Sequence, residues 1–260
     1  MNLLSKIKHA ELRSLRSRKF REKLRLSFVE GEIAVREILS SKAKIKYLLF
    51  SESKSEQLVA KFGDVLSKET EVFYLADAEF AEISDTVNSQ GVLAVFQFPK
   101  FAQLQDLTNF NKILVFDGVQ DPGNVGTLIR SASAFGVELI IALTGTAEIL
   151  SPKVLRSAAG LIYSLKFTQS IKQNEFAKFI HASNFNVFAA DMHGEDIYST
   201  SFAQPWMLIL GNEGAGISDE FKNDKIKPVK ISHDINVDSL NVSVAGSVIL
   251  SWIYKQGMKD

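Results

Sequence analysis

Short apolar runs alternate with stretches of helical periodicity along most of this 260-residue chain, and the alternation limits the folds open to it. Runs such as 113–119 and 206–211 are short and bounded by loop residues, as buried strands are. The stretches between such runs place apolar residues three or four positions apart, as amphipathic helices do. Strands that alternate with helices form a largely parallel sheet with helices on both faces, so the sequence predicts an α/β fold.

The pattern falls into two series with a break between them. In the first series we expect strands over 26–31, 45–51, 71–76 and 91–98, and helices over 32–41, 55–67 and 77–84. Pro99 then opens a polar-mixed stretch, and a sheet cannot continue through it because proline lacks an N–H group. We therefore divide the chain into a small α/β domain over 1–98, a linker over 99–111 and a larger domain over 112–260.

The second series supplies the larger domain. We expect strands over 113–119, 137–143, 164–169, 186–192, 206–211 and 226–232, and helices within 121–136 and over 151–159, 173–182 and 239–255. Asp121 or Asn124 can cap the first of these helices, and Gly136 can end it. In open parallel sheets, ligands bind beyond the carboxyl ends of the strands, so the loops at those ends are the candidate sites.

Charge is unevenly distributed along the chain, although the net charge is zero. Residues 1–25 carry nine Lys or Arg and two Glu, a net charge of +7, so the rest of the chain carries −7. Because Lys and Arg neutralise phosphates and release counterions, this segment favours binding to a polyanion, and we expect Arg16, Arg18, Lys19 and Arg21 to contact RNA. A solvated helix face kept soluble by its charges is the alternative.

Composition excludes several classes of protein. The chain has no cysteine, which rules out disulfides, cysteine-ligated zinc, iron–sulfur clusters and a thiol nucleophile. Its four histidines are scattered without the spacing of a metal site, and no apolar run reaches the roughly 20 residues that a membrane-spanning helix needs. The N-terminus is basic and has no apolar signal core. We therefore expect a cytoplasmic protein without a metal.

Three loops at expected strand ends contain unusual residues. The first, in DGVQDPGNVGTLIRSA, combines three glycines with Asn124 and leads to Arg130 on the following helix. Arg130 comes six residues after Asn124, less than two helical turns away, so both side chains can face one crevice. A glycine-rich turn followed by a surface arginine is the plainer interpretation.

The second loop, in LILGNEGAGIS, places Gly211, Gly214 and Gly216 around Asn212 and Glu213. Glycines let a backbone approach a ligand closely, with N–H groups free to point at it. The spacing is not the G-x-G-x-x-G of dinucleotide-binding folds, which disfavours a nucleotide-dependent oxidoreductase. A tight turn with a solvent-facing Glu213 is the alternative.

The third loop, in DSLNVSVAGS, places Ser239 and Asn241 where a helix is expected to start. Ala245, Gly246 and Ser247 keep that helix slim, so it can pack closely on the strand behind it. Ser239 is most simply a helix cap, because it lacks the G-x-S-x-G context of a hydrolase nucleophile.

In this order, DGVQDPGNVGTLIRSASAFG, LILGNEGAGI and DSLNVSVA resemble the three motifs of the SpoU (TrmH) family of RNA 2′-O-ribose methyltransferases, in the SPOUT superfamily. The resemblance covers roughly residues 112–256. The basic run and the FVEG that follows it resemble the family's N-terminal substrate-binding domain, a small fold similar to ribosomal protein L30e. The resemblance implies a SPOUT-type parallel sheet with a C-terminal trefoil knot, and a homodimer with its active site near the subunit interface.

The resemblance also implies a cofactor and a set of site residues. S-adenosylmethionine would be held largely by backbone groups around Gly211, Asn212, Gly214, Ile231, Leu240 and Asn241. The polar catalytic set would be Asn124, Arg130, Glu213, Ser239 and Asn241. Arg130 is the family's proposed base, but a guanidinium stays protonated at ordinary pH, so we expect it to clamp a phosphate and stabilise the developing alkoxide. The two asparagines would orient Arg130 and the ribose, Glu213 would fix its loop, and Ser239 would be chiefly structural.

The sequence therefore predicts an enzyme that methylates ribose 2′-hydroxyls in RNA. The additional N-terminal domain favours 23S ribosomal RNA as the substrate. A tRNA ribose methyltransferase and a non-catalytic RNA-binding or ribosome-assembly factor that keeps the fold are the alternatives, and the intact polar set argues against the second. A Rossmann-type methyltransferase is disfavoured because the glycine-dense loop lies late in the chain.

Overall fold

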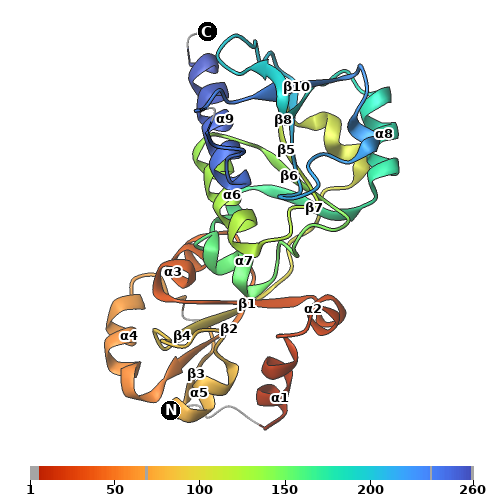
Figure 1. The fold of residues 1–260 in the computed structure, drawn as a ribbon. Coiled ribbons are helices and arrows are strands. Elements are labelled where there is room, and N and C mark those ends of the chain that lie inside the picture. The colour runs from red at the N-terminus through yellow and green to blue at the C-terminus, as the bar shows by residue number, and fades with distance from the viewer. Residues whose placement is uncertain (1–5, 68–69, 235, 259–260) are drawn as a thin grey trace. The chain divides into compact units, whose positions relative to one another are not determined.

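Six strands from the second half of the chain form one parallel sheet in the computed structural model, which describes residues 6–67, 70–234 and 236–258 (Figure 1). They are β5 (Lys112–Asp117), β6 (Leu139–Leu143), β7 (Lys166–Ile171), β8 (Asn186–Asp196), β9 (Trp206–Gly211) and β10 (Ile226–Lys230). Their spatial order is β10-β8-β9-β5-β6-β7, and every adjacent pair is parallel. The predicted parallel sheet is confirmed.

Helices cover both faces of this sheet, as expected. Figure 1 shows α6 (Pro122–Ala134) and α9 (Val242–Gly257) on one face and α8 (Gln173–Ala182) on the other. Close packing of α9 depends on Gly246, since a Cβ there would lie 2.5 Å from side-chain carbons of Leu128 and Leu210. The Ser131 and Ser247 hydroxyls meet at 2.6 Å between α6 and α9, so small residues do bring this helix close.

Capping side chains fix where α6 and α9 begin. Asp121 caps α6 by accepting a hydrogen bond from the backbone N–H of Asn124 at 2.9 Å, and Gly136 follows its end with φ +69°. The last helix begins at Val242 rather than at 239, because Asn241 supplies the cap. The expectation that Ser239 caps this helix is therefore wrong.

The first half of the chain forms a separate four-stranded sheet. Its strands are β1 (Leu26–Glu30), β2 (Ile45–Ser51), β3 (Val72–Leu75) and β4 (Val92–Gln97), in the order β1-β4-β2-β3. β4 runs antiparallel to β1 and β2, whereas β2 and β3 are parallel. The helices of this part are α1 (Lys6–Ser14), α2 (Arg18–Leu24), α3 (Glu32–Ser40), α4 (Ser55–Phe62) and α5 (Asp77–Ile83), with a 3-10 turn, η1 (Glu52–Lys54).

The two sheets belong to two units of the chain, and one segment from the second half of the chain belongs to the first unit. Unit 1 comprises residues 1–100 and 150–164, and unit 2 comprises residues 101–149 and 165–260. The inserted segment contains α7 (Pro152–Ser157) and η3 (Leu161–Ser164), and the Ser27 hydroxyl of β1 donates to the carbonyl of Leu150 at 2.7 Å. The remaining 3-10 turns, η2 (Leu104–Asn109) and η4 (Asp219–Phe221), lie in unit 2.

The sequence pattern divides the chain into consecutive segments and assigns 150–164 to the larger domain. In the structure this segment belongs to unit 1, because α7 packs against β1 and η3 packs against α3. No helix in the described parts of the chain is long and apolar enough to cross a membrane.

Candidate active site

Two loops with the unusual residues start side by side at the carboxyl edge of the parallel sheet. β5 and β9 are neighbours, and their last residues, Asp117 and Gly211, are register partners. The loop before α6 and the glycine loop, residues 211–218, therefore leave the sheet together. This arrangement brings residues about 90 positions apart in the sequence within hydrogen-bonding reach.

Asn124 joins this pair of loops to the start of the last helix. Its side-chain amide nitrogen donates to a carboxylate oxygen of Glu213 at 3.0 Å, and its side-chain oxygen accepts from the Asn241 amide at 3.1 Å. Because a carboxylate can only accept, the amide of Asn124 has one consistent orientation between its two partners. Three of the five predicted catalytic residues are thus directly connected.

The capping role of Asn241 fixes the other end of this chain of hydrogen bonds. Its side-chain oxygen accepts from the backbone N–H of Ser243 at 2.9 Å and of Val244 at 3.3 Å, and from the Ser243 hydroxyl at 2.6 Å. With its oxygen directed into the helix, its amide nitrogen is the group left to face Asn124. One residue therefore starts α9 and orients the polar cluster.

Glu213 is held by donors from the neighbouring loop. Besides Asn124, the backbone N–H groups of Gln120 and Asp121 donate to its carboxylate, each at 3.3 Å. Partial burial raises the pKa of Glu213, but these hydrogen bonds act in the opposite direction and leave that pKa below its usual value. The carboxylate is therefore charged at neutral pH and is a poor proton acceptor.

The glycine loop is closed by its own asparagine. The side-chain nitrogen of Asn212 donates to the carbonyl of Gly118 at 2.8 Å, and its oxygen accepts from the N–H groups of Gly214 and Ala215 at 2.9 Å. Gly211 permits this tight return, because a Cβ on it would lie 2.4 Å from the carbonyl oxygen of Gly216. The side chain of Asn212 thus shapes the loop.

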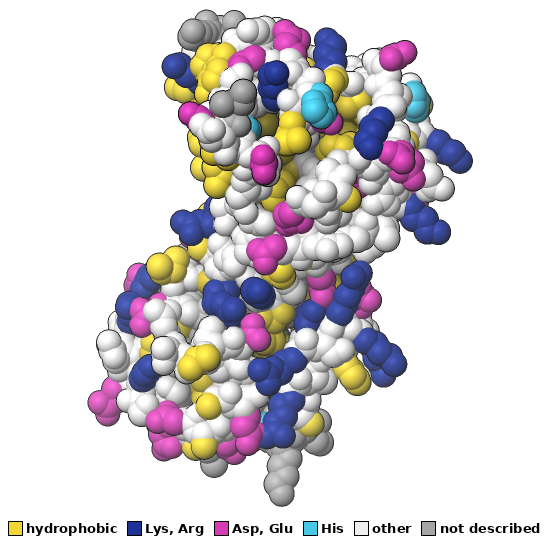
Figure 2. All heavy atoms as spheres, in the orientation of Figure 1, with side chains coloured by type: hydrophobic (Ala, Val, Ile, Leu, Met, Phe, Trp, Pro, Cys, Tyr) yellow, Lys and Arg dark blue, Asp and Glu magenta, His cyan; other side chains and the backbone are white. Residues whose placement is uncertain are grey.

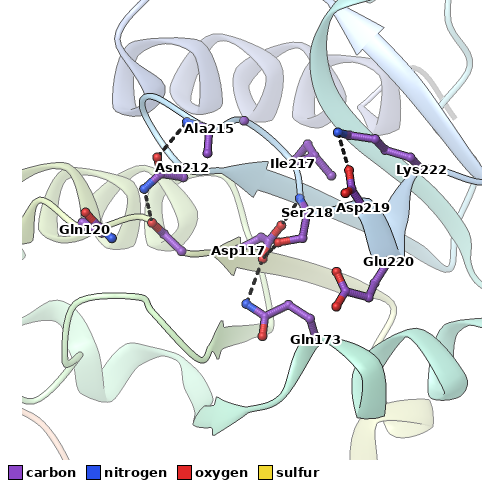
Figure 3. A pocket seen from close by; sticks show the side chains of 12 residues that line it. Asp117, Gln120, Gln173, Asn212, Ala215, Ile217, Ser218, Asp219, Glu220 and Lys222 are labelled. Atoms are coloured by element: carbon purple, nitrogen blue, oxygen red, sulfur yellow. Dashed lines mark hydrogen bonds and ion pairs between the residues drawn. The ribbon is translucent and has the colours of Figure 1, made fainter.

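Asp117 anchors the far end of the glycine loop, a role that sequence reasoning missed. Its side chain is only 2% exposed and accepts from the backbone N–H of Ser218 at 2.7 Å, the Ser218 hydroxyl at 2.8 Å and Gln173 at 3.2 Å (Figure 3). A carboxylate ending a run of buried apolar residues is the signal that could have found it, since buried charges need several partners.

An open hollow of about 640 Å³ lies beside this anchor. It is lined by Asp117, Gly118, Gln120, Gln173, Asn212, Lys222 and residues 215–220 (Figure 3). Of the predicted cofactor-binding residues only Asn212 lines it, and Gln120, which also lines it, donates its backbone N–H to Glu213 of the polar cluster. Among the described residues, no group of three or more His, Asp or Glu could hold a metal ion.

The remaining predicted cofactor residues lie at the carboxyl ends of β9 and β10 and before α9. Gly211 is buried, Gly214 is exposed, and Ile231 and Leu240 are half-buried. Beside them, β8 contains a five-residue bulge, because Ala189 and Glu195 pair with consecutive residues of β10. This bulge, residues 190–194, was not anticipated from the sequence.

Arg130 and Ser239 lie outside the connected cluster. Arg130 is exposed on α6, and within the described residues its guanidinium has no hydrogen-bond or ion-pair partner. Six residues rotate a helix by about 240°, and among the described residues no hydrogen bond joins Arg130 to Asn124. The expectation that both face one crevice stays a prediction. Ser239 is exposed before α9.

The basic N-terminal residues divide into exposed and buried ones. Arg16, Arg18 and Lys19 are exposed, whereas Arg21 is 4% exposed and donates to the backbone carbonyls of Leu15 and Arg16 at 2.7 and 2.9 Å. The expectation that Arg21 contacts RNA is corrected, because its guanidinium ties α2 to the end of α1. Residues 1–5 lie outside the described residues.

Two family models match the chain. The SpoU rRNA Methylase family matches residues 111–251, and the MRM3-like substrate binding domain matches residues 5–94. The 23S rRNA (guanosine(2553)-2′-O)-methyltransferase of Bacillus subtilis is 27% identical over 241 residues, covering 92% of each chain.

Two solved structures are similar over nearly the whole chain. A TrmH-family protein from Porphyromonas gingivalis has a TM-score of 0.81 and 29% identity, covering 98% of this chain and 100% of that one. An rRNA methyltransferase from Sinorhizobium meliloti, solved with S-adenosylmethionine bound, has a TM-score of 0.82 and 26% identity, covering 98% and 97%.

Protonation of Glu213 should release Asn124. Because the pKa of Glu213 is lowered in the folded protein, the stabilisation from its hydrogen bonds is complete above the usual glutamate pKa of 4.5. It is lost as the pH falls through the folded pKa. The side-chain amide resonances of Asn124 should therefore titrate with a midpoint below 4.5 in a nuclear magnetic resonance experiment.

Glu213→Gln should remove this titration, whereas Glu220→Gln, an exposed glutamate following the same loop, should leave it unchanged. A midpoint at or above 4.5, or a titration that survives in Glu213→Gln, would contradict the assignment.

Proposed function

The chain belongs to the SpoU rRNA Methylase family, and we propose that it transfers a methyl group from S-adenosylmethionine to a ribose 2′-hydroxyl of RNA. The observation that carries this proposal is the junction of Asn124, Glu213 and Asn241. These residues come from the three separate stretches that resemble the family's motifs, and hydrogen bonds connect them at one edge of the sheet. A non-catalytic RNA-binding protein would not require this connected polar set.

The residues present fit the implied cofactor. A Cβ on Gly211 would clash with the backbone of Gly216, so a glycine is needed where this tight loop begins. Gly214, in the same loop after β9, is exposed. Ile231 and Leu240 offer half-buried apolar surface, which suits a flat adenine ring. When bound, S-adenosylmethionine supplies a methyl group on a positively charged sulfur. We assign Gly211, Gly214, Ile231, Leu240 and the Asn241 backbone to its binding, with Asn212 shaping the loop.

The transfer requires the ribose 2′-oxygen to be deprotonated and aligned. An electron pair of that oxygen forms the new bond to the methyl carbon, the carbon–sulfur bond breaks and its electrons stay on sulfur, and the hydroxyl proton leaves to a base or to water. Glu213 does not suit the role of base, because three donors occupy its carboxylate and its pKa is lowered. Its proposed role, with Asn124 and Asn241, is to orient the ribose and the loops.

Arg130 is the proposed electrostatic component of the site. A guanidinium stays protonated, so Arg130 would clamp an RNA phosphate and stabilise the negative charge that develops on the 2′-oxygen. Its exposed guanidinium has no partner among the described residues and is available for such a contact. Ser239 is assigned a supporting role in the loop before α9.

We propose that two copies of the chain build each complete site. Arg130 comes about 240° around α6 from Asn124, and among the described residues no hydrogen bond joins it to the polar cluster. The last helix and its C-cap also expose apolar side chains along one stripe, and Val244, Tyr254 and Met258 lie in it. Such a stripe is typical of an interface between subunits. A homodimer explains both features.

Ribosomal RNA is the proposed substrate, in preference to transfer RNA. The relatives from Bacillus subtilis and Sinorhizobium meliloti are named as rRNA methyltransferases, and the match to the substrate-binding domain covers residues 5–94. We propose Arg16, Arg18 and Lys19 as phosphate contacts, and Figure 2 shows Lys and Arg side chains gathered on unit 1. We propose a cytoplasmic location for the protein. The trefoil knot implied by the resemblance stays a prediction.

Arg130→Ala should lower the rate of methyl transfer about a hundredfold or more, while the Kd of S-adenosylmethionine changes by no more than a few-fold. Arg130→Lys keeps the charge but loses bidentate geometry, so it should restore only part of the rate. Lys166→Ala removes another exposed cation of unit 2 and serves as the control. Near-normal turnover of Arg130→Ala would refute this role.

Deleting the gene should remove one 2′-O-methyl group from 23S ribosomal RNA, as read by mapping ribose methylation in the mutant and parent strains. Re-expression of the chain should restore the mark, and the Arg130→Ala variant should not. A ribosome with unchanged methylation together with an altered transfer RNA would favour the tRNA alternative. Restoration of the mark by the Arg130→Ala variant would argue for a role other than catalysis.

Sedimentation analysis should give a mass twice that of the 28.9 kDa chain. Tyr254→Glu puts a charge into the apolar stripe and should shift the protein to a monomer that binds RNA but transfers no methyl group. Val59→Glu, at an exposed apolar position of unit 1, is the matched control. A fully active monomer would contradict the two-copy site.

A further inference from the structure

The open hollow of unit 2 borders the polar cluster without belonging to it. Gln120 and Asn212 line the hollow, and the backbone N–H of Gln120 donates to Glu213 at 3.3 Å. The other residues assigned to the cofactor, among them Ile231 and Leu240, do not line it. The hollow is therefore left to the second reactant, the RNA, beside the groups proposed to orient the ribose.

The size and position of the hollow suit a nucleobase. Its volume of about 640 Å³ lies within the range of sites for small organic molecules. Ala215 and Ile217 give it apolar surface against which the flat face of a base can lie. In a nucleotide, the base is attached to the ribose carbon next to the one that carries the 2′-hydroxyl. A ribose held at the polar cluster can therefore place its base in the hollow.

The charge of the lining disfavours a phosphate. Three carboxylates line the hollow, those of Asp117, Asp219 and Glu220, and Lys222 is the one cation among the lining residues. Lys222 pairs with Asp219 at 2.7 Å, which leaves an excess of negative charge. An RNA phosphate would be repelled there, whereas the N–H groups on the edge of a base would be attracted.

Two acceptors in the hollow have no donor within the described residues. Gln173 uses its amide nitrogen on Asp117 at 3.2 Å and on the Thr144 carbonyl at 2.8 Å, so its side-chain oxygen is left to accept. Glu220 forms no side-chain hydrogen bond or ion pair in the described chain, and Figure 3 shows its carboxylate directed into the hollow. The side chain of Gln120 is likewise unpaired there, so its amide can donate or accept.

We propose that the hollow receives the base of the target nucleotide and that Glu220 selects guanine. This inference rests on the proposed function and specifies the nucleotide that is methylated. Guanine carries two adjacent donors on its Watson–Crick edge, the N1–H and the N2 amino group. A carboxylate accepts both, as it does from the paired donors of an arginine. Gln120 can donate to the neighbouring O6 of the same base.

The other bases match these groups less well. Uracil has one ring N–H between two carbonyl oxygens, which a carboxylate repels. Adenine and cytosine each present one amino group beside a ring nitrogen without a proton. In every case the Watson–Crick edge must be unpaired to reach Glu220, so the target guanosine lies in a loop or bulge or is turned out of its helix.

The 2′-O-methyl group that is lost from 23S ribosomal RNA when the gene is deleted should lie on a guanosine. On RNA from that strain, Glu220→Gln should lower kcat/KM for methyl transfer about tenfold or more, because a buried donor of the base then faces the glutamine amide. The Kd of S-adenosylmethionine should not change. Glu175→Gln, at an exposed glutamate of α8 that does not line the hollow, is the matched control and should behave as the parent protein.

Replacing the target guanosine with inosine removes the N2 amino group and one hydrogen bond to Glu220. In an RNA fragment that spans the mapped nucleotide, this replacement should lower kcat/KM of the parent protein about tenfold. In Glu220→Gln it should cost less than about threefold, because the contact is already lost. The thermal midpoint of Glu220→Gln should equal that of the parent, because Glu220 is exposed and its side chain has no partner in the described chain.

A binding experiment tests the hollow without methyl transfer. Addition of 5′-GMP should shift the side-chain amide resonances of Gln120 and Gln173 in a nuclear magnetic resonance spectrum. Addition of 5′-UMP at the same concentration should not shift them, and Glu220→Gln should abolish the response to 5′-GMP.

A mapped methyl group on adenosine, cytidine or uridine would overturn the proposal, as would a Glu220→Gln variant with the parent's kcat/KM. Weaker binding of S-adenosylmethionine by Glu220→Gln would assign the hollow to the cofactor and also overturn it. Failure of the parent protein to methylate any RNA would instead refute the proposed function. In that case the response to 5′-GMP and 5′-UMP still decides whether the hollow binds guanine.

Discussion

Asn124 is the residue on which the proposed site depends, because it joins parts of the chain that are otherwise separate. It receives its position from the Asp121 cap of α6 and then bridges Glu213 at the end of β9 and Asn241 at the start of α9. Each partner also has a structural task, one in the glycine loop and one as a helix cap. The same hydrogen bonds therefore stabilise the fold and orient the groups proposed to act on RNA.

Close backbone approach makes this junction possible. Gly211 lets the glycine loop fold back on itself, and Gly246 lets α9 lie against α6 and β9. The buried carboxylate of Asp117 then fixes the end of the loop through two bonds from Ser218. A larger residue at either glycine would separate elements that must meet for the three polar side chains to connect.

Buried charged side chains give unit 1 its shape and help to separate structural residues from functional ones. Arg21 and Glu30 are both buried from solvent. Their side chains form hydrogen bonds with the backbone and side chains of neighbouring segments. Arg16 and Lys19 remain at the surface of the same region. A basic run in a sequence therefore includes residues that build the surface as well as residues available to a polyanion.

The sequence by itself determined the parallel sheet, most of its strands and the three loops, because burial on both faces requires continuous apolar runs and close turns require glycine. It also identified Asn124, Glu213 and Asn241 as candidates. Only the tertiary structure decided that these three meet, that Asn241 and not Ser239 caps α9, and that residues 150–164 pack in unit 1. Those outcomes depend on which distant segments pack together, and local periodicity carries no record of that choice.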